Sequence, residues 1–387
     1  MKQIFAGILF LASMTTLTMA QDSTKLIIHS LPPFHPSGSE IYVAGSFNGW
    51  NPADKNYKFK RSSKGSYSLT LLLPVGEYEY KLTRGSWDKS ECKADGEALE
   101  NRHLTVTGNA NSYNLSVEEW VDRFPAKTKE STASKNVHII DTAFLIPQLK
   151  RARRVWIYLP EDYAHSRKHY PVLYMQDGQN VFDEATAYSG EWSVDEYLDA
   201  LPDKEKECIV VAVDHGGLKR LNEYDPYNNK RFGKGEGSAY AEFLVKTLKP
   251  FIDKQYRTKP SKENTFIAGS SMGGLISLYT VLKYPDVYGG AGIFSPALWI
   301  APKLYDYMNR QGKKLDADIY FYGGTKEDSS MVPNIEKAVS VLEKMSKSTI
   351  KTAIGEGESH SEAAWRKSFP LFYEWLMEAR ARTVSPK

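Results

Sequence analysis

The sequence Gly269-Ser270-Ser271-Met272-Gly273 has the spacing G-x-S-x-G, in which a serine can act as a nucleophile. An apolar run at 265–269 predicts a strand before it, and an apolar run at 275–282 predicts a helix after it. Glycines on either side let the strand and the helix meet at a sharp turn that exposes the serine hydroxyl. We therefore expect Ser271 to be a nucleophile rather than part of a plain tight turn. The backbone N–H of Met272 would then face a developing oxyanion.

A serine nucleophile needs a base, which follows it in the chain when the serine lies on a strand–turn–helix junction. His360 is the only one of the eight histidines that comes after Ser271. It lies in a polar segment, 355–361, directly after the strand-like run 349–354, which is where a base would stand on a loop. His360 is therefore the predicted base, and the alternative is a solvent-exposed loop histidine.

The third catalytic member should be an acid that orients and stabilises the imidazole from the loop after the preceding strand. The run 319–324 predicts that strand, and both Glu327 and Asp328 follow it. Either carboxylate qualifies from its position alone. A serine–histidine pair without a working acid is the remaining alternative.

A second oxyanion donor is expected at an earlier junction between a strand and a loop. The run 171–175 predicts the strand, and Gly178 shortly after it permits close backbone approach. The backbone N–H of Gln179 is therefore the candidate donor. Removing one such donor typically costs about 3–4 kcal/mol of transition-state stabilisation.

The elements that must position these residues follow a recognisable order. Helical stretches such as 239–256 and 334–344 lie between compact apolar runs that are typical of buried strands. Alternating strands and helices predict an α/β fold with a mostly parallel sheet. The strand-like runs are 155–159, 171–175, 208–213, 265–269, 290–294 and 318–323.

The first part of the chain, 25–121, has a different texture. Short β-branched and aromatic runs at 41–45, 67–73 and 78–82 are separated by Gly, Pro, Asn and Asp, which predicts an all-β sandwich. The turn residues at 74–76 predict a hairpin between the last two runs. Two tryptophans in this region lie in loops, where they could stack on a sugar ring or, alternatively, close the ends of the core.

Composition excludes several classes of protein. Against 47 Asp and Glu, the 50 Lys and Arg give a net charge of +3, too balanced for a nucleic-acid-binding surface. With 41% hydrophobic and 25% charged residues, the 387-residue chain is globular and long enough for about two domains. Cys92 and Cys208 lie too far apart for a disulfide framework or a cysteine-based zinc site, and we expect two unpaired buried thiols. No metal and no cofactor are expected.

The N-terminus predicts the compartment. Lys2 precedes an apolar run at 4–12, and small residues occupy positions 18 and 20. This is the pattern of a secretory signal peptide, 1–20, cleaved near Ala20-Gln21. The run is too short to span a bilayer, and a buried N-terminal helix is the alternative. The mature protein should be periplasmic or extracellular, with no membrane span.

Residues 47–52, 73–81 and 87–102 together resemble a starch- or glycogen-binding module. The resemblance implies an immunoglobulin-like sandwich, an α-glucan ligand, and a sugar site at Trp50, Lys81, Trp87 and Asn101. Asn101 and Glu91 stand further from Trp87 than the spacing of that family. The expected organisation is a module at 21–122, a linker at 123–136 and a second domain at 137–380.

The second domain is similar to the esterase D-like family of α/β-hydrolases, which includes feruloyl, acetyl-xylan and siderophore esterases. The similarity spans about 137–379 and implies a serine carboxyl-ester hydrolase without a cofactor. It also favours Glu327 over Asp328, because 324–327 resembles the glycine-x-x-acid spacing of the family. The positions that carry it are 174–182, Trp192, Arg220, 223–226, the Ser271 turn, 295–299, His360 and 365–366.

The long polar, glycine-rich segment 215–240 is predicted to form one wall of a substrate pocket, the alternative being a plain surface loop. Arg220 and Glu223 within it are candidate substrate-binding residues. Trp192 and Trp299 could line the same pocket, or each could belong to the core.

Three functions remain open from the sequence. The first is a secreted esterase that releases feruloyl or acetyl groups from carbohydrate while the first module holds the glycan. The second is a periplasmic siderophore esterase of the enterobactin-trilactone type, for which the basic residues of 215–240 would suit an anionic ferric catecholate. The third is a glycan-binding protein whose hydrolase domain has lost its activity.

Overall fold

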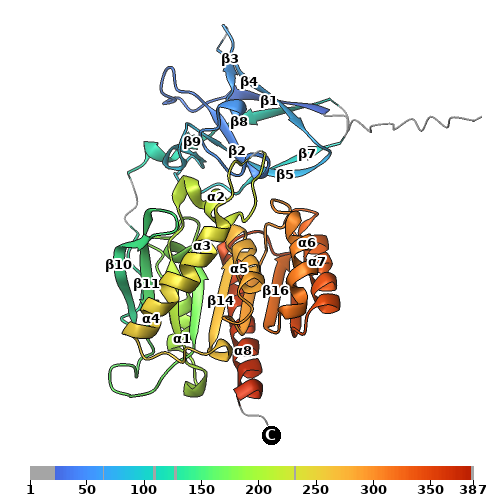
Figure 1. Cartoon of the computed structure of the whole chain (residues 1–387). Coiled ribbons are helices and arrows are strands. Elements are labelled where there is room, and N and C mark those ends of the chain that lie inside the picture. The colour runs from blue at the N-terminus through green and yellow to red at the C-terminus, as the bar shows by residue number, and fades with distance from the viewer. Residues whose placement is uncertain (1–21, 64, 108–109, 126–128, 231, 385–387) are drawn as a thin grey trace, which may run out of the picture. The chain divides into compact units, whose positions relative to one another are not determined.

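The computed structural model describes residues 22–384, apart from 64, 108–109, 126–128 and 231. The predicted signal peptide at 1–20 therefore lies outside the described residues. The chain divides into two compact units, Met1–Phe124 and Pro125–Lys387, which are described one at a time (Figure 1). The boundary falls inside the predicted linker.

The first unit is built of short strands in two main sheets. One sheet has the order β3-β4-β1-β8, the other has the order β2-β5-β7, and β6 pairs with β9. Alternate side chains of β4 are buried, which gives the period of two that a strand with one buried face requires. The strands are β1 (Asp22–Ser30), β2 (Tyr42–Gly45), β3 (Lys60–Arg61), β4 (Tyr67–Leu73), β5 (Gly76–Thr83), β6 (Glu91–Cys92), β7 (Arg102–Val106), β8 (Asn111–Ser116) and β9 (Glu119–Trp120).

The predicted hairpin at 74–76 is wrong, although both of its strands are present. β4 pairs with β1 and β3, whereas β5 pairs with β2 and β7, so the chain crosses from one sheet to the other at Pro74. The physical reason is that both strands bury one apolar face in the same core. Leu71 of β4 and Leu82 of β5 belong to a single cluster of buried side chains, which two facing sheets can share and a flat hairpin cannot.

The second unit contains an eight-stranded sheet with the order β10-β11-β13-β12-β14-β15-β16-β17. The strands from β13 to β17 run parallel, while β10 and β11 join antiparallel at one edge. The carboxyl ends of the parallel strands therefore meet at one edge of the sheet, where ligands bind in open α/β folds. The strands are β10 (Val137–Ile146), β11 (Arg151–Tyr158), β12 (Val172–Gln176), β13 (Ile209–Val213), β14 (Thr265–Ser270), β15 (Gly290–Phe294), β16 (Asp318–Gly324) and β17 (Ile350–Gly355).

Helices cover both faces of this sheet, as Figure 1 shows for α3, α4 and α5 on one side and α8 on the other. Two clusters of buried side chains correspond to the two faces: one includes residues of α3 to α7, and the other residues of α1 and α8. The helices are α1 (Val194–Asp199), α2 (Arg220–Tyr224), α3 (Gly237–Phe243), α4 (Lys249–Gln255), α5 (Met272–Lys283), α6 (Lys303–Gln311), α7 (Met331–Met345) and α8 (Glu362–Val384).

Part of the predicted linker, residues 129–136, makes specific contacts in the second unit. Residues 129–136 lie along the second unit, where Lys129 pairs with Glu184 and the Asn136 amide donates to Asp199 Oδ1 at 2.7 Å. This stretch is polar because its partners are carboxylates, so its composition resembles that of a solvated linker.

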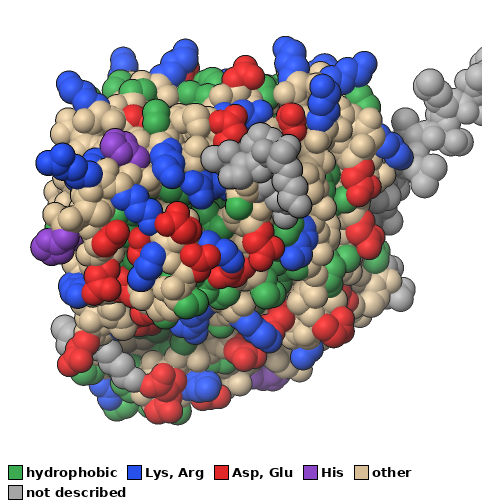
Figure 2. Space-filling view, turned by 90° about the horizontal axis from the view of Figure 1, so that it is seen from below, with side chains coloured by type: hydrophobic (Ala, Val, Ile, Leu, Met, Phe, Trp, Pro, Cys, Tyr) green, Lys and Arg blue, Asp and Glu red, His purple; other side chains and the backbone are tan. Residues whose placement is uncertain are grey.

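Three further observations bear on function. Within the described residues, no helix is both long enough and apolar enough to cross a membrane, and no cluster of three His, Cys, Asp or Glu could hold a metal ion. Cys92 and Cys208 are unpaired and buried, and burial raises their pKa values to about 11 and about 12. On the face shown in Figure 2, acidic and basic side chains are interspersed, as expected from the near-neutral net charge.

Candidate active site

The turn at Ser271 has the geometry that a strained nucleophile requires. β14 ends at Ser270, α5 begins at Met272, and Ser271 between them has φ 56° and ψ −119°. A Cβ on Gly269 would lie 2.7 Å from the carbonyl carbon of Gly273, so only glycine fits where the strand passes the helix. Such backbone strain persists only where the surrounding structure enforces it, and it is typical of functional sites.

The backbone around Ser271 is held by the last residue of β15 and by the loop that follows it. Ser271 N–H donates to Phe294 O at 2.9 Å, and Ser271 O accepts from Ala297 N–H at 3.1 Å. Met272 is the first residue of α5, so its N–H is among those with no acceptor inside the helix. An anion near Ser271 would thus meet an N–H group and the positive end of the helix dipole.

His360 contacts Glu327. Its Nδ1 lies 2.6 Å from Glu327 Oε2, and the two residues stand on the loops that follow β17 and β16. The Glu327 side chain is only 1% exposed, whereas that of His360 is 31% exposed, so the imidazole closes the carboxylate off from solvent on one side. The Trp365 ring packs edge-on against the imidazole with centroids 5.0 Å apart. These contacts fix the orientation of the histidine ring.

Glu327 is further held by two donors to its other oxygen. Oε1 accepts from Gly324 N–H at 2.6 Å and from the Ser295 hydroxyl at 2.7 Å. Burial on its own would raise the pKa of the Glu327 carboxyl, but the charge of His360 and these hydrogen bonds outweigh it, and the pKa lies below its usual value. The carboxylate is therefore ionised at neutral pH.

Asp328, the alternative acid, has different partners. Its Oδ1 accepts from Ser330 N–H at 2.8 Å and from the Ser330 hydroxyl at 2.5 Å. It thus closes the turn that leads into α7. Of the two candidate carboxylates, Glu327 is the one that the structure brings to His360.

The candidate oxyanion loop, residues 177–180, follows β12. Asp177 has a left-handed conformation with φ 58°, and a Cβ on Gly178 would lie 2.9 Å from the backbone of Ala212 in β13. Arg220 holds Asp177 through two parallel hydrogen bonds of 2.7 and 2.8 Å. Burial on its own would lower the pKa of Arg220, but the Asp177 carboxylate outweighs it and raises the pKa. The structure thus places Arg220 as a support of the turn that carries Gln179.

The segment 215–240 is not the structureless loop that the sequence predicts, since it contains α2 and the start of α3. The Glu223 side chain in it has no exposed surface, and its Oε1 accepts from Arg151 at 2.7 Å and from Arg153. Direct contact between Glu223 and a substrate is not supported by this geometry. Glu223 is buried because it pairs with Arg153, which lies 70 positions away in the sequence. A local sequence pattern does not reveal such a pairing.

The two candidate pocket tryptophans differ in their surroundings. Trp192 is 4% exposed and packs edge-on against Phe294 at 4.9 Å, so it belongs to the core between the sheet and α8. Trp299, which follows β15, is 40% exposed and keeps Phe232 as an edge-on neighbour at 6.1 Å. Of these two tryptophans, only Trp299 has a ring that is exposed to solvent and could contact a substrate.

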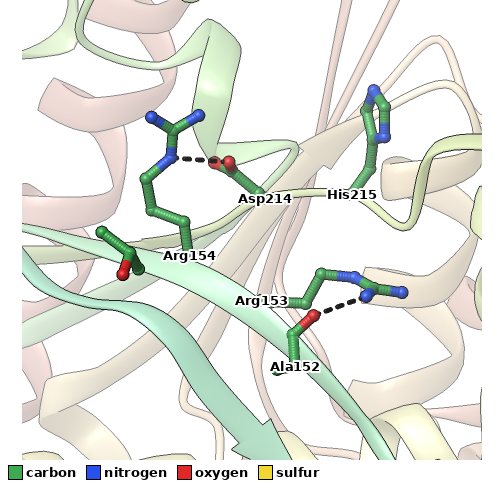
Figure 3. Close-up of a pocket in the computed structure, with 6 residues that line it drawn as sticks. Ala152, Arg153, Arg154, Asp214 and His215 are labelled. Carbon is green, nitrogen blue, oxygen red and sulfur yellow. Dashed lines mark hydrogen bonds and ion pairs between the residues drawn. The ribbon is translucent and has the colours of Figure 1, made fainter.

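A hollow of about 350 Å³ lies where β11 meets the end of β13 (Figure 3). Its arginines already have partners: Arg154 Nε donates to Asp214 at 2.9 Å, and Arg153 donates to Ala152 O at 2.7 Å and to Glu223. His215 N–H donates to Gln179 Oε1 at 3.2 Å, which links the hollow to the loop. The lining residues are Thr142, Ala152, Arg153, Arg154, Asp214 and His215.

The first unit contains the four predicted sugar-binding residues. The rings of Trp50 and Trp87 lie 6.3 Å apart at an angle of 38°, and both side chains are partly exposed. Lys81 stands on β5, and Asn101 donates to Glu79 Oε2 on the same strand at 2.9 Å. Burial lowers the pKa of Lys81. Two adjacent, partly exposed aromatic rings are the kind of surface on which sugar rings stack.

The sequence did not predict the roles of two residues of the site. Ser295 bonds to Glu327, and Glu362, the first residue of α8, accepts from the Asn180 amide at 3.1 Å. Ser295 directly follows a predicted strand, and Glu362 stands two positions after His360. Their nearness in sequence to these predicted features was the only sign that could have pointed to them.

Comparisons with known proteins match both units. Residues 146–376 match the family described as "Putative esterase", and 37–120 match the pullulanase X25 domain. The first unit is 45% identical over 95 residues to an alpha-amylase of Niallia circulans, covering 24% of this chain and 7% of the amylase. An endo-1,4-beta-xylanase/feruloyl esterase of Xylanibacter ruminicola is 28% identical over 220 residues, covering 54% of this chain and 27% of that protein.

The chain thus spans only a small part of these two relatives, and it spans 58% of YbbA of Bacillus subtilis, which is 28% identical over 153 residues. Among solved structures, the BES protein of Bacillus cereus has a TM-score of 0.53 at 18% identity, covering 65% of this chain and 99% of that chain. Enterochelin esterase of Shigella flexneri has a TM-score of 0.51 at 14% identity and covers 88% of both chains. These likenesses establish the fold, an α/β-hydrolase preceded by a β-rich region. Because the family match extends over more than half of the sequence, the chain belongs to the family described as "Putative esterase".

Proposed function

We propose that this protein is a serine esterase that hydrolyses acylated carbohydrate outside the cytoplasm, with Ser271, His360 and Glu327 as its catalytic residues. The observation that carries the catalytic assignment is the 2.6 Å contact between His360 Nδ1 and Glu327 Oε2. An ionised Glu327 accepts a hydrogen bond from the Nδ1–H group of the neutral imidazole and leaves Nε2 as the nitrogen that can act as a base. The strained turn supplies the nucleophile from β14.

The reaction proceeds in two halves. His360 Nε2 takes the proton of the Ser271 hydroxyl while the oxygen attacks the ester carbonyl, and it then returns the proton to the leaving alcohol. Water attacks the resulting acyl-enzyme in the same way and releases the acid and free Ser271. The N–H groups of Met272 and Gln179 stabilise the oxyanion of each tetrahedral intermediate. The positive imidazolium that forms in each half is stabilised by the buried Glu327 carboxylate.

Two relatives support a carbohydrate-linked ester. One is named a xylanase/feruloyl esterase and resembles the second unit, and the other is named an alpha-amylase and resembles the first. An X25 match beside an esterase match fits a chain that holds a glycan and cleaves an ester on it. The proposed ligand of the first unit is an α-glucan, bound at Trp50, Trp87, Lys81 and Asn101.

The test of the catalytic proposal is the initial rate of the full chain beside Ser271→Ala. The panel comprises p-nitrophenyl acetate, methyl ferulate, acetylated xylo-oligosaccharides, an acylated malto-oligosaccharide and enterobactin. Turnover by the wild type that falls at least 10³-fold in Ser271→Ala supports the nucleophile. Ser340→Ala, a serine of α7 outside the site, is the matched control. Cleavage of enterobactin without cleavage of any feruloyl or acetyl ester would overturn the carbohydrate assignment.

The glycan proposal has its own measurement. Titration calorimetry of the full chain with maltoheptaose should give binding that Trp50→Ala weakens at least tenfold, because the variant loses the apolar ring surface that a sugar would cover. Trp299→Ala is the control, since Trp299 is an exposed tryptophan of the other unit. If Trp299→Ala abolishes binding and Trp50→Ala does not, the glucan site lies on the esterase unit.

A further inference from the structure

Three carboxylates between the end of β12 and the first turn of α1 are buried but do not enter the proposed reaction. Asp183, Glu191 and Asp195 are 7%, 4% and 0% exposed. A buried carboxylate needs hydrogen-bond donors, because it loses its contact with water. Each of the three accepts a hydrogen bond from one segment, 129–136, which is here called the strap.

The strap binds both ends of the loop 183–191, here called the clasp loop. Thr132 N–H donates to Asp183 Oδ1 at 3.2 Å, and the Thr132 hydroxyl donates to Glu191 Oε2 at 2.9 Å and accepts from Glu184 N–H at 2.8 Å. The Ser131 hydroxyl donates to Asp183 Oδ2 at 3.0 Å. Thr132 therefore closes the clasp loop by joining its first residues to its last.

The clasp loop in turn holds the oxyanion loop. The Thr186 hydroxyl donates to Gln179 O at 2.7 Å, and Tyr188 N–H donates to Asn180 Oδ1 at 3.1 Å. Trp192 N–H, immediately after the clasp loop, donates to Asn180 O at 2.8 Å. Thus two consecutive carbonyls that follow the proposed oxyanion donor are fixed by a loop that the strap closes.

We propose that the strap positions the oxyanion donor, with Thr132 as the positioning residue. The inference rests on the proposed role of the Gln179 N–H. Asp177, two residues before Gln179, has a strained left-handed conformation, so the oxyanion loop keeps its shape only while its neighbours hold it. Releasing the clasp loop frees the Gln179 and Asn180 carbonyls, and the Gln179 N–H can then turn away from the oxyanion. An error of about 1 Å in such a group can cost 10²-fold in rate.

A purely structural role for the strap makes a different prediction. If the strap only stabilises the fold, loss of the Thr132 hydroxyl lowers the melting temperature and leaves kcat unchanged well below that temperature. Because Thr132 is an exposed residue, Thr132→Val removes the hydroxyl without a cavity in the core. Thr132→Ser keeps the hydroxyl and is the rescue variant.

The experiment uses the full chain with p-nitrophenyl acetate as substrate. Thr132→Val should lower kcat about 10-fold with KM within twofold of the wild type, and Thr132→Ser should restore kcat. Ser134→Ala is the matched control, because its hydroxyl accepts from Asn136 N–H within the strap, at 3.2 Å, and has no bond to the clasp loop among the described residues. A wild-type kcat in Thr132→Val overturns the proposal.

Hydrogen exchange of the same proteins tests the strap separately from the chemistry. Amides in peptides that cover 177–192 should exchange faster in Thr132→Val than in the wild type, with no change in Ser134→Ala. Unchanged exchange at 177–192 overturns the positioning role even if no ester is turned over. Conversely, a wild type without esterase activity but with faster exchange in Thr132→Val contradicts the proposed function and leaves the strap's hold on the loop intact.

Discussion

Ser295 Oγ donates a 2.7 Å hydrogen bond to Glu327 Oε1 and accepts a 2.9 Å hydrogen bond from Trp365 Nε1. Ser295 is fully buried and has a positive φ of 42°. The preceding residue, Phe294, accepts the hydrogen bond of Ser271 N–H. The last residue of β15 and the residue after it therefore contact the backbone of the proposed nucleophile and the carboxylate of the proposed acid, respectively.

Ser295→Ala should lower both activity and stability. The change removes a hydrogen bond to a charged group, which is worth about 1.5–3 kcal/mol, and leaves the Trp365 N–H without its acceptor. We expect the free energy of unfolding to fall by about that amount and kcat to fall about tenfold, because Glu327 loses one of the donors that fix it. Urea unfolding and ester turnover measure the two effects. Ser330→Ala, which removes a comparable bond to Asp328, should leave kcat within twofold.

The two candidate acids can be separated by charge-neutral substitutions. Glu327→Gln keeps the size of the side chain but offers an amide to His360 Nδ1, which favours the wrong imidazole tautomer. The analogous change in a serine protease triad costs about 10⁴-fold in kcat, and we expect a loss of that order. Asp328→Asn should cost less than twofold, since the Asp328 carboxylate bonds to Ser330 in the turn before α7. Equal losses in both variants would contradict the assignment of Glu327.

Much of the second unit could be predicted from the sequence, because buried parallel strands are continuous apolar runs. The predicted strand at 290–294 matches β15, and the helix predicted at 334–344 lies within α7. β10 escaped prediction because it is an edge strand with mostly exposed side chains, so its apolar pattern is interrupted. α2 escaped because a helix of five residues has too little periodicity to be recognised.

The site could be predicted where its residues are contiguous in sequence. Ser271 was found because the strand, the glycines and the helix are contiguous in sequence. The bond between Ser295 and Glu327 joins residues 32 positions apart, and the pairing of Arg153 with Glu223 joins residues 70 apart. Such contacts depend on strand order, which local pattern does not determine. That is why Glu223 was expected at a substrate and is instead enclosed between arginines.

Glu223→Gln should destabilise the protein with little effect on substrate binding. Glu223 has no exposed side-chain surface and accepts hydrogen bonds from Arg151 and Arg153. Removing one partner of a buried ion pair leaves an uncompensated charge, which typically costs about 3–5 kcal/mol. Chemical unfolding should reveal that loss, and KM for methyl ferulate should stay within twofold. Glu205→Gln is the control for an exposed carboxylate. A large rise in KM with unchanged stability would instead favour a substrate-binding role for Glu223.

Asp195→Asn should change how stability depends on pH. Burial raises the pKa of Asp195 from 3.8 to about 8, although the hydrogen bond from Ser134 N–H acts in the opposite direction. Between these two values the folded state binds more protons than the unfolded state, so the free energy of unfolding falls as pH rises, by at most about 1.4 kcal/mol per unit. The neutral asparagine lacks this dependence. Its melting temperature relative to the wild type should therefore increase from pH 5 to pH 8. Scanning calorimetry at pH 5, 6.5 and 8 measures this difference, and Glu130→Gln, an exposed carboxylate of the strap, is the control. If the melting temperatures of Asp195→Asn and the wild type change with pH in parallel, the pKa of Asp195 is not raised.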